Sequence, residues 1–314
     1  MTTTKAGDGG GSGKPPEMPN PFAERPDERI AGLSRLIDVQ PAEAVGRYRG
    51  LRVMGGVGRV YGGQVVAQAL AAAAKSAPAD RMVHSLHCYF LRGGSEDHEI
   101  DFEVEADFDG GSFSNRRVIA RQQGEVIFNL SASFHVAEPG HFHQVQMPDA
   151  PEPEGLKTVT ELARETQPDL LRGMMERILL RPSPFEIRPL DGTAMLRVPS
   201  PEWATSYWFR TVAPISPEQW LQRAMLAYQS DWGILAAAIG WHGAVRAKAA
   251  SLDHNIWFHS DCRVDEWMLF HLESPWAGGA RGLGRGQIFD RSGRLIASVA
   301  QEGLMRDRSL RPSP

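Results

Sequence analysis

The sequence predicts an α+β protein that consists of two similar units in tandem. In the first half, an alanine-rich run at 61–74, typical of a helix, precedes several strand-like segments, which is the order of the α+β class. The second half repeats this pattern, because aromatic pairs at 89–90 and 257–258 are each followed 21 residues later by two glycines. Equivalent positions therefore lie 168 residues apart up to these glycines and 169 apart after them, which indicates an internal duplication.

The first unit is predicted at 28–138, after a Gly-, Pro- and Ser-rich segment, 1–27, that is typical of a flexible tail. A short helix is expected at 28–39, and the small side chains of the helix at 61–74 allow close packing on a sheet. Four strands are predicted, at 83–91, 99–106, 112–121 and 125–135. The last two are joined by a short turn, so we expect an antiparallel sheet.

A proline-rich connector at 139–203, with a helical insert at about 156–180, is predicted to lead into a second unit at 204–314. In that unit Asp231 stands directly before an apolar run, so a buried helix is expected to begin there. Ser251 is expected to open the next apolar strand.

Composition excludes several classes of protein. The 314 residues include 42% hydrophobic residues and carry a net charge of −4, so no basic surface indicates nucleic-acid binding. Two cysteines in apolar surroundings do not indicate a disulfide framework. No apolar run is long enough for a signal peptide or a membrane span. We expect a cytoplasmic protein without membrane insertion, metal or cofactor.

At three equivalent positions the first unit carries a small or apolar residue where the second carries a polar one. The pairs are Gly63 and Asp231, Val83 and Ser251, and Ala132 and Gln301. Packing does not explain three polar residues in one copy, so they form a candidate functional set. A carboxylate, a hydroxyl and an amide together can hold one water molecule and remove its proton. This chemistry suits hydrolysis of an activated carbonyl without a covalent enzyme intermediate.

Four segments resemble the type II acyl-CoA thioesterases, the TesB family, which includes peroxisomal long-chain enzymes. They are YGGQVVAQAL (61–70), VHSLHCYFLR (83–92), LDHNIWFH (252–259) and VAQEGLMR (299–306). The resemblance extends over about residues 35–307 and implies a double hotdog fold, in which each unit wraps a long helix in a curved sheet. It also implies hydrolysis of a fatty acyl-CoA to the free acid and CoA, and assembly into a homodimer or homotetramer.

The same resemblance implies that Asp231, Ser251 and Gln301 are catalytic, with Ser251 where bacterial members often carry threonine. Gly62, Gly63, Gln64 and His84 are candidate substrate-binding residues. The first two glycines open a helix whose backbone N–H groups can face a developing oxyanion. His84 matches a histidine of the family, although its apolar strand favours a hydrogen-bonded core role.

Some nearby residues receive weaker assignments. Asp253 is expected to be structural, and His254 is expected to point to the opposite face of its strand. Several tryptophans, Trp232 among them, are expected in the core or along an acyl tunnel. Basic residues on strands are candidates to meet CoA phosphates, although such residues commonly only solvate a sheet face; they are Arg116, Arg117, Arg281 and Arg285.

Two other functions stay open. An enoyl-CoA hydratase of the same architecture needs an Asp and a His at one helix start, and no histidine follows Asp231 until His242. A non-catalytic acyl-CoA binding module does not need all three polar residues. A serine hydrolase of the α/β class is disfavoured, because the sequence has no G-x-S-x-G segment. The acyl chain length cannot be read from residue types.

Overall fold

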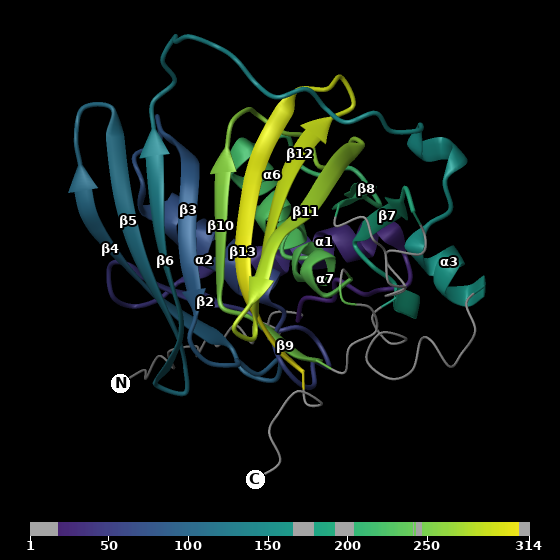
Figure 1. Ribbon diagram of the computed structural model, residues 1–314. Helices are drawn as coiled ribbons and strands as arrows, with labels where there is room; N and C mark the ends of the chain where they lie inside the picture. Colours follow the sequence, from purple (N-terminus) through teal and green to yellow (C-terminus); the bar gives the residue numbers. More distant parts are fainter. Residues whose placement is uncertain (1–17, 166–178, 192–203, 241, 243–246, 308–314) are drawn as a thin grey trace, which may run out of the picture.

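The computed structural model describes residues 18–165, 179–191, 204–240, 242 and 247–307. In these residues thirteen strands form one continuous sheet, which curves around the buried helices (Figure 1). Every pairing within the sheet is antiparallel, as the α+β prediction requires.

The first half of the sheet confirms the four predicted strands to within three residues at each end. It also contains two short strands that were not predicted, because each has too few residues to show an alternating pattern. In spatial order the six strands are β1 (Gln40–Pro41), β2 (Arg47–Gly50), β4 (Ile100–Asp109), β5 (Phe113–Gln122), β6 (Glu125–His135) and β3 (Met82–Phe90).

The second half continues the same sheet from β3. In spatial order its strands are β10 (Asp253–Phe258), β13 (Leu295–Asp307), β12 (Arg281–Asp290), β11 (Met268–Gly278), β8 (Ala204–Thr211) and β7 (Phe185–Pro189), and β9 (Ala247–Ser251) pairs with the far end of β13. The edge strand β7 comes from the predicted connector, so the second half of the sheet begins before residue 204.

The two halves meet where β3 pairs with β10. His87 lies opposite Asn255, and these residues occupy equivalent positions of the two repeats. The Nδ1 atom of His87 and Oδ1 of Asn255 are 3.0 Å apart. Because equivalent residues face each other at this point, the two repeats are related by an approximate twofold axis. The pairing of β3 with β10 joins the sheets of the two units into a single sheet.

The helices lie on the inner face of this curved sheet (Figure 1). They are α1 (Pro26–Ile37), α2 (Gly62–Ser76), α6 (Gln219–Ser230) and α7 (Ile234–Gly240), while α3 (Val159–Glu165) lies outside the sheet. Both α2 and α6 are buried on nearly all sides and pack against each other. A Cβ atom at Gly63 would lie 2.2 Å from the carbonyl oxygen of Tyr228, so this approach requires glycine.

The prediction that a helix begins at Asp231 is wrong. Asp231 is the C-cap of α6, and the next helix, α7, begins at Ile234 after a turn in which Gly233 has a φ of +86°. The second unit therefore has two short helices where one long helix was expected, and the left-handed Gly233 separates them. Ser251 likewise ends β9, and the next strand begins at Asp253.

Residues 18–23 of the predicted tail are packed on the protein. The backbone N–H of Met54 donates to the carbonyl oxygen of Pro19, and Phe22 packs against the core beneath the guanidinium of Arg181. These contacts fix the chain ahead of α1, and residues 1–17 lie outside the described ranges.

The connector runs from β6 across the ends of the strands, past the turn between β12 and β13, towards α3 (Figure 1). The side-chain amide of Gln144 holds it there, because Nε2 donates to the carbonyl oxygen of Gly293 and Oε1 accepts from the N–H of Leu295. Most of the predicted helical insert, 166–178, lies outside the described residues. Among the helices described, none combines the length and the apolar character needed to cross a membrane.

Candidate active site

Asp231 lies between α6 and α7 and faces the first turn of α2. Its Oδ2 atom accepts a hydrogen bond of 3.0 Å from the backbone N–H of Gly63. The residue at the cap position of α2, Tyr61, provides no side-chain cap. A carboxylate at a helix N-terminus satisfies a free N–H group and interacts favourably with the helix dipole. The second half of the chain therefore caps the central helix of the first half.

The other carboxylate oxygen of Asp231, Oδ1, is buried and accepts no hydrogen bond from the described residues. Two tyrosine hydroxyls nearby hold the surrounding backbone: Tyr61 donates to the carbonyl oxygen of Tyr228 at 3.0 Å, and Tyr207 donates to that of Trp232 at 2.7 Å. Burial, with the charge of Asp231 as a smaller contribution, raises the pKa of Tyr61 well above its usual range. Tyr61 therefore stays protonated and donates its hydrogen to the carbonyl oxygen of Tyr228.

Ser251 and Gln301 contact each other directly. The amide Nε2 of Gln301 donates to Oγ of Ser251 at 2.8 Å. Ser251 ends β9 and pairs with Gly303 of β13, which brings the two side chains to neighbouring strands. Gln301 is 1% exposed, whereas Ser251 is half-buried. The structure therefore joins two of the three predicted catalytic residues by a hydrogen bond.

His254 links this pair to the end of α6. Its Nδ1 atom is 2.5 Å from Oε1 of Gln301, and its Nε2 atom is 2.8 Å from Oγ of Ser230. The ring is fully buried. Burial lowers the pKa of His254, while the negative charge of Asp231 opposes this effect. A row of hydrogen-bonded side chains thus extends from Ser230, the neighbour of Asp231, to Ser251.

The sequence analysis did not give His254 a role. It placed this side chain opposite Asp253, and the structure agrees, since His254 is buried while Asp253 accepts a hydrogen bond from the N–H of Glu302. A signal was nevertheless present in the repeat, because the position equivalent to His254 is Leu86. This is a fourth place where an apolar residue of the first unit becomes polar in the second.

The predicted substrate-binding residues fall in two places. Gly62, Gly63 and Gln64 form the first turn of α2 beside Asp231, although the N–H of Gly63 is engaged by that carboxylate. His84 lies apart from this group, because its Nε2 atom is 2.8 Å from Oγ of Ser133. Its ring contacts two other rings, those of Phe113 and His135.

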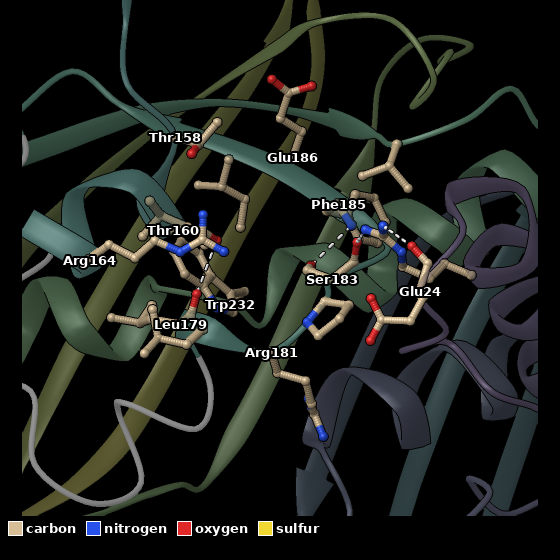
Figure 2. Close-up of a pocket in the computed structure, with 16 residues that line it drawn as sticks. Glu24, Thr158, Thr160, Arg164, Leu179, Arg181, Ser183, Phe185, Glu186 and Trp232 are labelled. Carbon is tan, nitrogen blue, oxygen red and sulfur yellow. Dashed lines mark hydrogen bonds between the residues drawn. The ribbon is translucent and has the colours of Figure 1, made fainter.

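A cavity of about 390 Å³ lies beside Trp232, the residue that follows Asp231 (Figure 2). Its apolar wall includes Val159, Leu179 and Phe185. In Figure 2, Trp232, Leu179 and their neighbours gather at one end of the cavity, and Phe185 lies at the other. The volume lies within the range of small-molecule sites, and apolar and polar side chains line the cavity in equal number.

The cavity is also lined by three arginines, Arg29, Arg164 and Arg181. Within the described part of the chain, none of these has a carboxylate at ion-pairing distance, and Arg29 donates only to backbone carbonyl oxygens. Of the two glutamates in the lining, Glu186 is neutralised by Arg188 and Arg210. The cavity therefore combines apolar walls with an excess of positive charge.

The arginines that were candidates to meet CoA phosphates are engaged by carboxylates. Arg116 is buried against Asp109, and Arg281 pairs with Glu302. The same holds for Arg117 with Glu105 and for Arg285 with Glu273. The cationic groups of the cavity are therefore better placed to receive an anion.

This fold and this buried polar set define a hotdog protein. The fold is shared with a conserved hot dog fold protein from Alicyclobacillus acidocaldarius, with a TM-score of 0.69 and 17% identity over 90% of this chain and 98% of that one. A second solved structure, the acyl-CoA thioesterase II TesB2 from Mycobacterium marinum, has a TM-score of 0.72 and 37% identity, and the match covers 90% of this chain and 99% of that chain.

Sequence comparisons identify the family. An acyl-CoA thioesterase N-terminal domain model matches residues 52–135, and an acyl-CoA thioesterase model matches residues 197–304. Human acyl-coenzyme A thioesterase 8 is 37% identical over 290 residues, which are 89% of this chain and 90% of that protein. The chain belongs to the acyl-CoA thioesterase family, as the resemblance predicted.

Proposed function

We propose that this protein hydrolyses acyl-CoA thioesters to a free acid and CoA, with Asp231 as the general base. The observation that carries the proposal is the buried Oδ1 atom of Asp231, which accepts no hydrogen bond from the part of the chain that the structure describes. A carboxylate oxygen in this state is available to accept a proton from water. Ser251 and Gln301 supply the polar groups that orient that water.

The steps follow from these roles. Water attacks the thioester carbon while Asp231 accepts one of its protons, so a C–O bond forms and the carbonyl electrons move to oxygen. When the resulting intermediate collapses, the C–S bond breaks and the electron pair leaves with the CoA sulfur. The proton held by Asp231 is then returned to the thiolate or to solvent.

Water is a better nucleophile here than Ser251. A catalytic serine requires a base that accepts its proton, and the hydrogen bond to Ser251 is donated by the Gln301 amide, which cannot act as one. Hydrolysis therefore needs no acyl-enzyme.

The cavity beside Trp232 is the proposed substrate site. Its apolar wall suits an acyl chain or the pantetheine arm, and its arginines suit the phosphates of CoA. Trp232, which directly follows Asp231, lines this cavity, whereas Asp231, Ser251 and Gln301 themselves do not. A cytoplasmic location and a homodimeric or homotetrameric state remain predictions.

An enoyl-CoA hydratase is the less favoured reading. A buried histidine does lie close to Asp231, since β10 supplies His254 where the sequence analysis looked only along the helix. Both ring nitrogens of His254 are engaged, by Ser230 and by Gln301. A hydratase needs a histidine nitrogen that exchanges a proton with substrate, so these contacts argue against that activity.

The test is steady-state release of free thiol from acyl-CoAs, from acetyl to palmitoyl, with wild type and Asp231→Asn in parallel. Asparagine keeps the size and can still accept from Gly63, but it cannot serve as the base. We expect turnover to fall about 100-fold or more. The matched control is Asp253→Asn, which changes a second carboxylate of the same region and should keep near wild-type turnover.

The outcomes of this experiment distinguish the three candidate functions. Turnover that survives in Asp231→Asn would overturn the assignment of the base. Binding of acyl-CoA without turnover on any chain length would indicate the binding module, and consumption of enoyl-CoA without thiol release would indicate the hydratase.

A further inference from the structure

We infer that His254 is a positioning residue that fixes the amide of Gln301, by donating from Nδ1–H to Oε1 so that the amide nitrogen faces Ser251. The inference rests on the proposed function, because the orientation of Gln301 matters only if this side chain takes part in hydrolysis. It concerns a residue that does not itself touch the substrate.

The position of the Gln301 amide oxygen, beside His254, sets the direction of the hydrogen bond between the two side chains. An amide oxygen accepts and never donates, so the Nδ1 atom that lies 2.5 Å from Oε1 must carry a proton. The amide nitrogen then points the other way, to Oγ of Ser251 at 2.8 Å. Histidine is suited to this task because a ring N–H distinguishes the oxygen of an amide from its nitrogen.

The orientation decides what Ser251 can do. Its Oγ atom accepts from Gln301, so its own hydrogen stays available for water or the thioester oxygen. If the amide were turned around, Oε1 would face Ser251 and would take that hydrogen. His254 thus makes Ser251 a donor towards the reaction centre, and it leaves the second N–H of Gln301 available as another.

The other ring nitrogen is anchored as well. Because the neutral ring carries its proton on Nδ1, Nε2 accepts from the hydroxyl of Ser230, whose Oγ lies 2.8 Å away, and the single hydrogen of that hydroxyl is directed to Nε2 rather than to the carbonyl oxygen of Ala227, 3.0 Å from Oγ. Ser230 and His254 are both fully buried, so the ring has little freedom to rotate. Since Ser230 precedes Asp231, the same turn that places the base also holds the residue that orients Gln301.

The first test measures the proton in the wild-type protein. Long-range proton–nitrogen NMR on protein labelled with ¹⁵N-histidine distinguishes the protonation states of the two ring nitrogens, and His254→Asn identifies the signal. We expect Nδ1 of His254 to be protonated. A ring protonated only at Nε2 would overturn the inference.

The second test measures catalysis. His254→Leu places the residue of the equivalent position, Leu86, in the second unit and removes the donor while it preserves a packed interior. We expect kcat to fall about 10-fold or more with KM nearly unchanged. His254→Asn, whose amide can donate to Oε1, should recover much of the loss. The control is His271→Leu, since His271 makes a similar bond to Ser206 away from the site.

A double-mutant cycle connects the two residues. If His254 acts through Gln301, the change His254→Leu should cause no further decrease of kcat in a Gln301→Ala background. A decrease of kcat in the double variant that equals the product of the two single decreases would overturn the inference. If Gln301→Ala alone keeps full turnover, the proposed catalytic role of Gln301 fails, and the NMR result still decides which atom of His254 holds the proton.

Discussion

The N–H of Gly63 donates a 3.0 Å hydrogen bond to Oδ2 of Asp231, and these two residues occupy equivalent positions of the two repeats. The contact therefore lies close to the approximate twofold axis of the molecule. It explains why a carboxylate at the C-terminal end of α6, where the helix dipole disfavours negative charge, is stable: the N-terminus of α2 faces it.

Gly62→Ala should impair catalysis. A Cβ atom at this position would lie 2.7 Å from Oδ2 of Asp231 and 3.1 Å from the ring of Phe90. The carboxylate end of a side chain can move, so we expect a displaced base and a loss of turnover of about 10-fold or more, with only a small loss of stability. Thiol release and urea unfolding on the same preparation measure both quantities.

Gly63→Ala provides the contrast. Its Cβ atom would lie 2.2 Å from the carbonyl oxygen of Tyr228, and backbone of a buried helix cannot yield as a side chain does. We expect the free energy of unfolding to fall by about 1–3 kcal/mol. Unchanged stability would mean that α2 and α6 lie further apart than the structure places them.

Ser251→Ala and Ser251→Thr test the hydroxyl. Alanine removes the acceptor of the Gln301 amide and the donor towards the reaction centre, so we expect kcat to fall by about 100-fold. Threonine keeps the hydroxyl and should retain most of the turnover. Equal turnover in the alanine variant and the wild type would show that this hydroxyl has no part in the reaction.

Substitution of the cavity arginines should weaken binding of the CoA part. Arg164→Gln and Arg181→Gln remove cavity charges that form no close ion pair with a described carboxylate, although Arg181 lies within electrostatic range of Glu96. We expect KM for acyl-CoA to rise several-fold with kcat nearly constant, and its dependence on salt to decrease. Arg117→Gln, an exposed residue paired with Glu105, is the control and should leave KM unchanged. An unchanged KM in all three variants would place the CoA part elsewhere.

Stability should decrease in mild acid. Burial lowers the pKa of His254, so the folded protein keeps this ring neutral where an unfolded chain, with a histidine pKa near 6.5, binds a proton. Below about pH 6.5 the unfolded state thus binds more protons, and the free energy of unfolding falls by at most about 1.4 kcal/mol per pH unit from this residue.

Denaturant unfolding at several values between about pH 5 and pH 7.5 measures this slope. His254→Asn should flatten it in part, because burial also lowers the pKa of His84, His259 and His271. A slope that is the same in wild type and in His254→Asn would show that His254 is protonated equally in the folded and unfolded states.

The sequence predicted the strands well because each has a long alternating pattern, as in β6. It failed at Asp231, since the pair Ser-Asp before an apolar run is typical of a helix start and equally possible at a helix end. The deciding feature is the left-handed Gly233, which lies against the side chains of Tyr207 and Leu272. These contacts join residues far apart in the chain, so no local pattern reveals them.

The site was predictable to the extent that it differs between the repeats. Comparison of equivalent positions found Ser251 and Gln301, which the structure joins by a hydrogen bond. The same comparison contained His254 against Leu86, but the histidine was judged only by the face of its strand. The cavity beside Trp232 could not be predicted from the sequence, because its walls come from distant segments: α3, the connector and the chain ahead of α1.

The contact between Gly63 and Asp231 has a consequence for ancestry. In a symmetric pair of identical single units, an aspartate at this position would meet its own copy across the axis, and two buried carboxylates would repel each other. Once the two units are fused in one chain, one copy can become glycine and supply an N–H group while the other keeps the charge. Gene duplication thus allows the two equivalent positions to carry different residues, a donor N–H group in one unit and a carboxylate in the other, which two identical subunits cannot do.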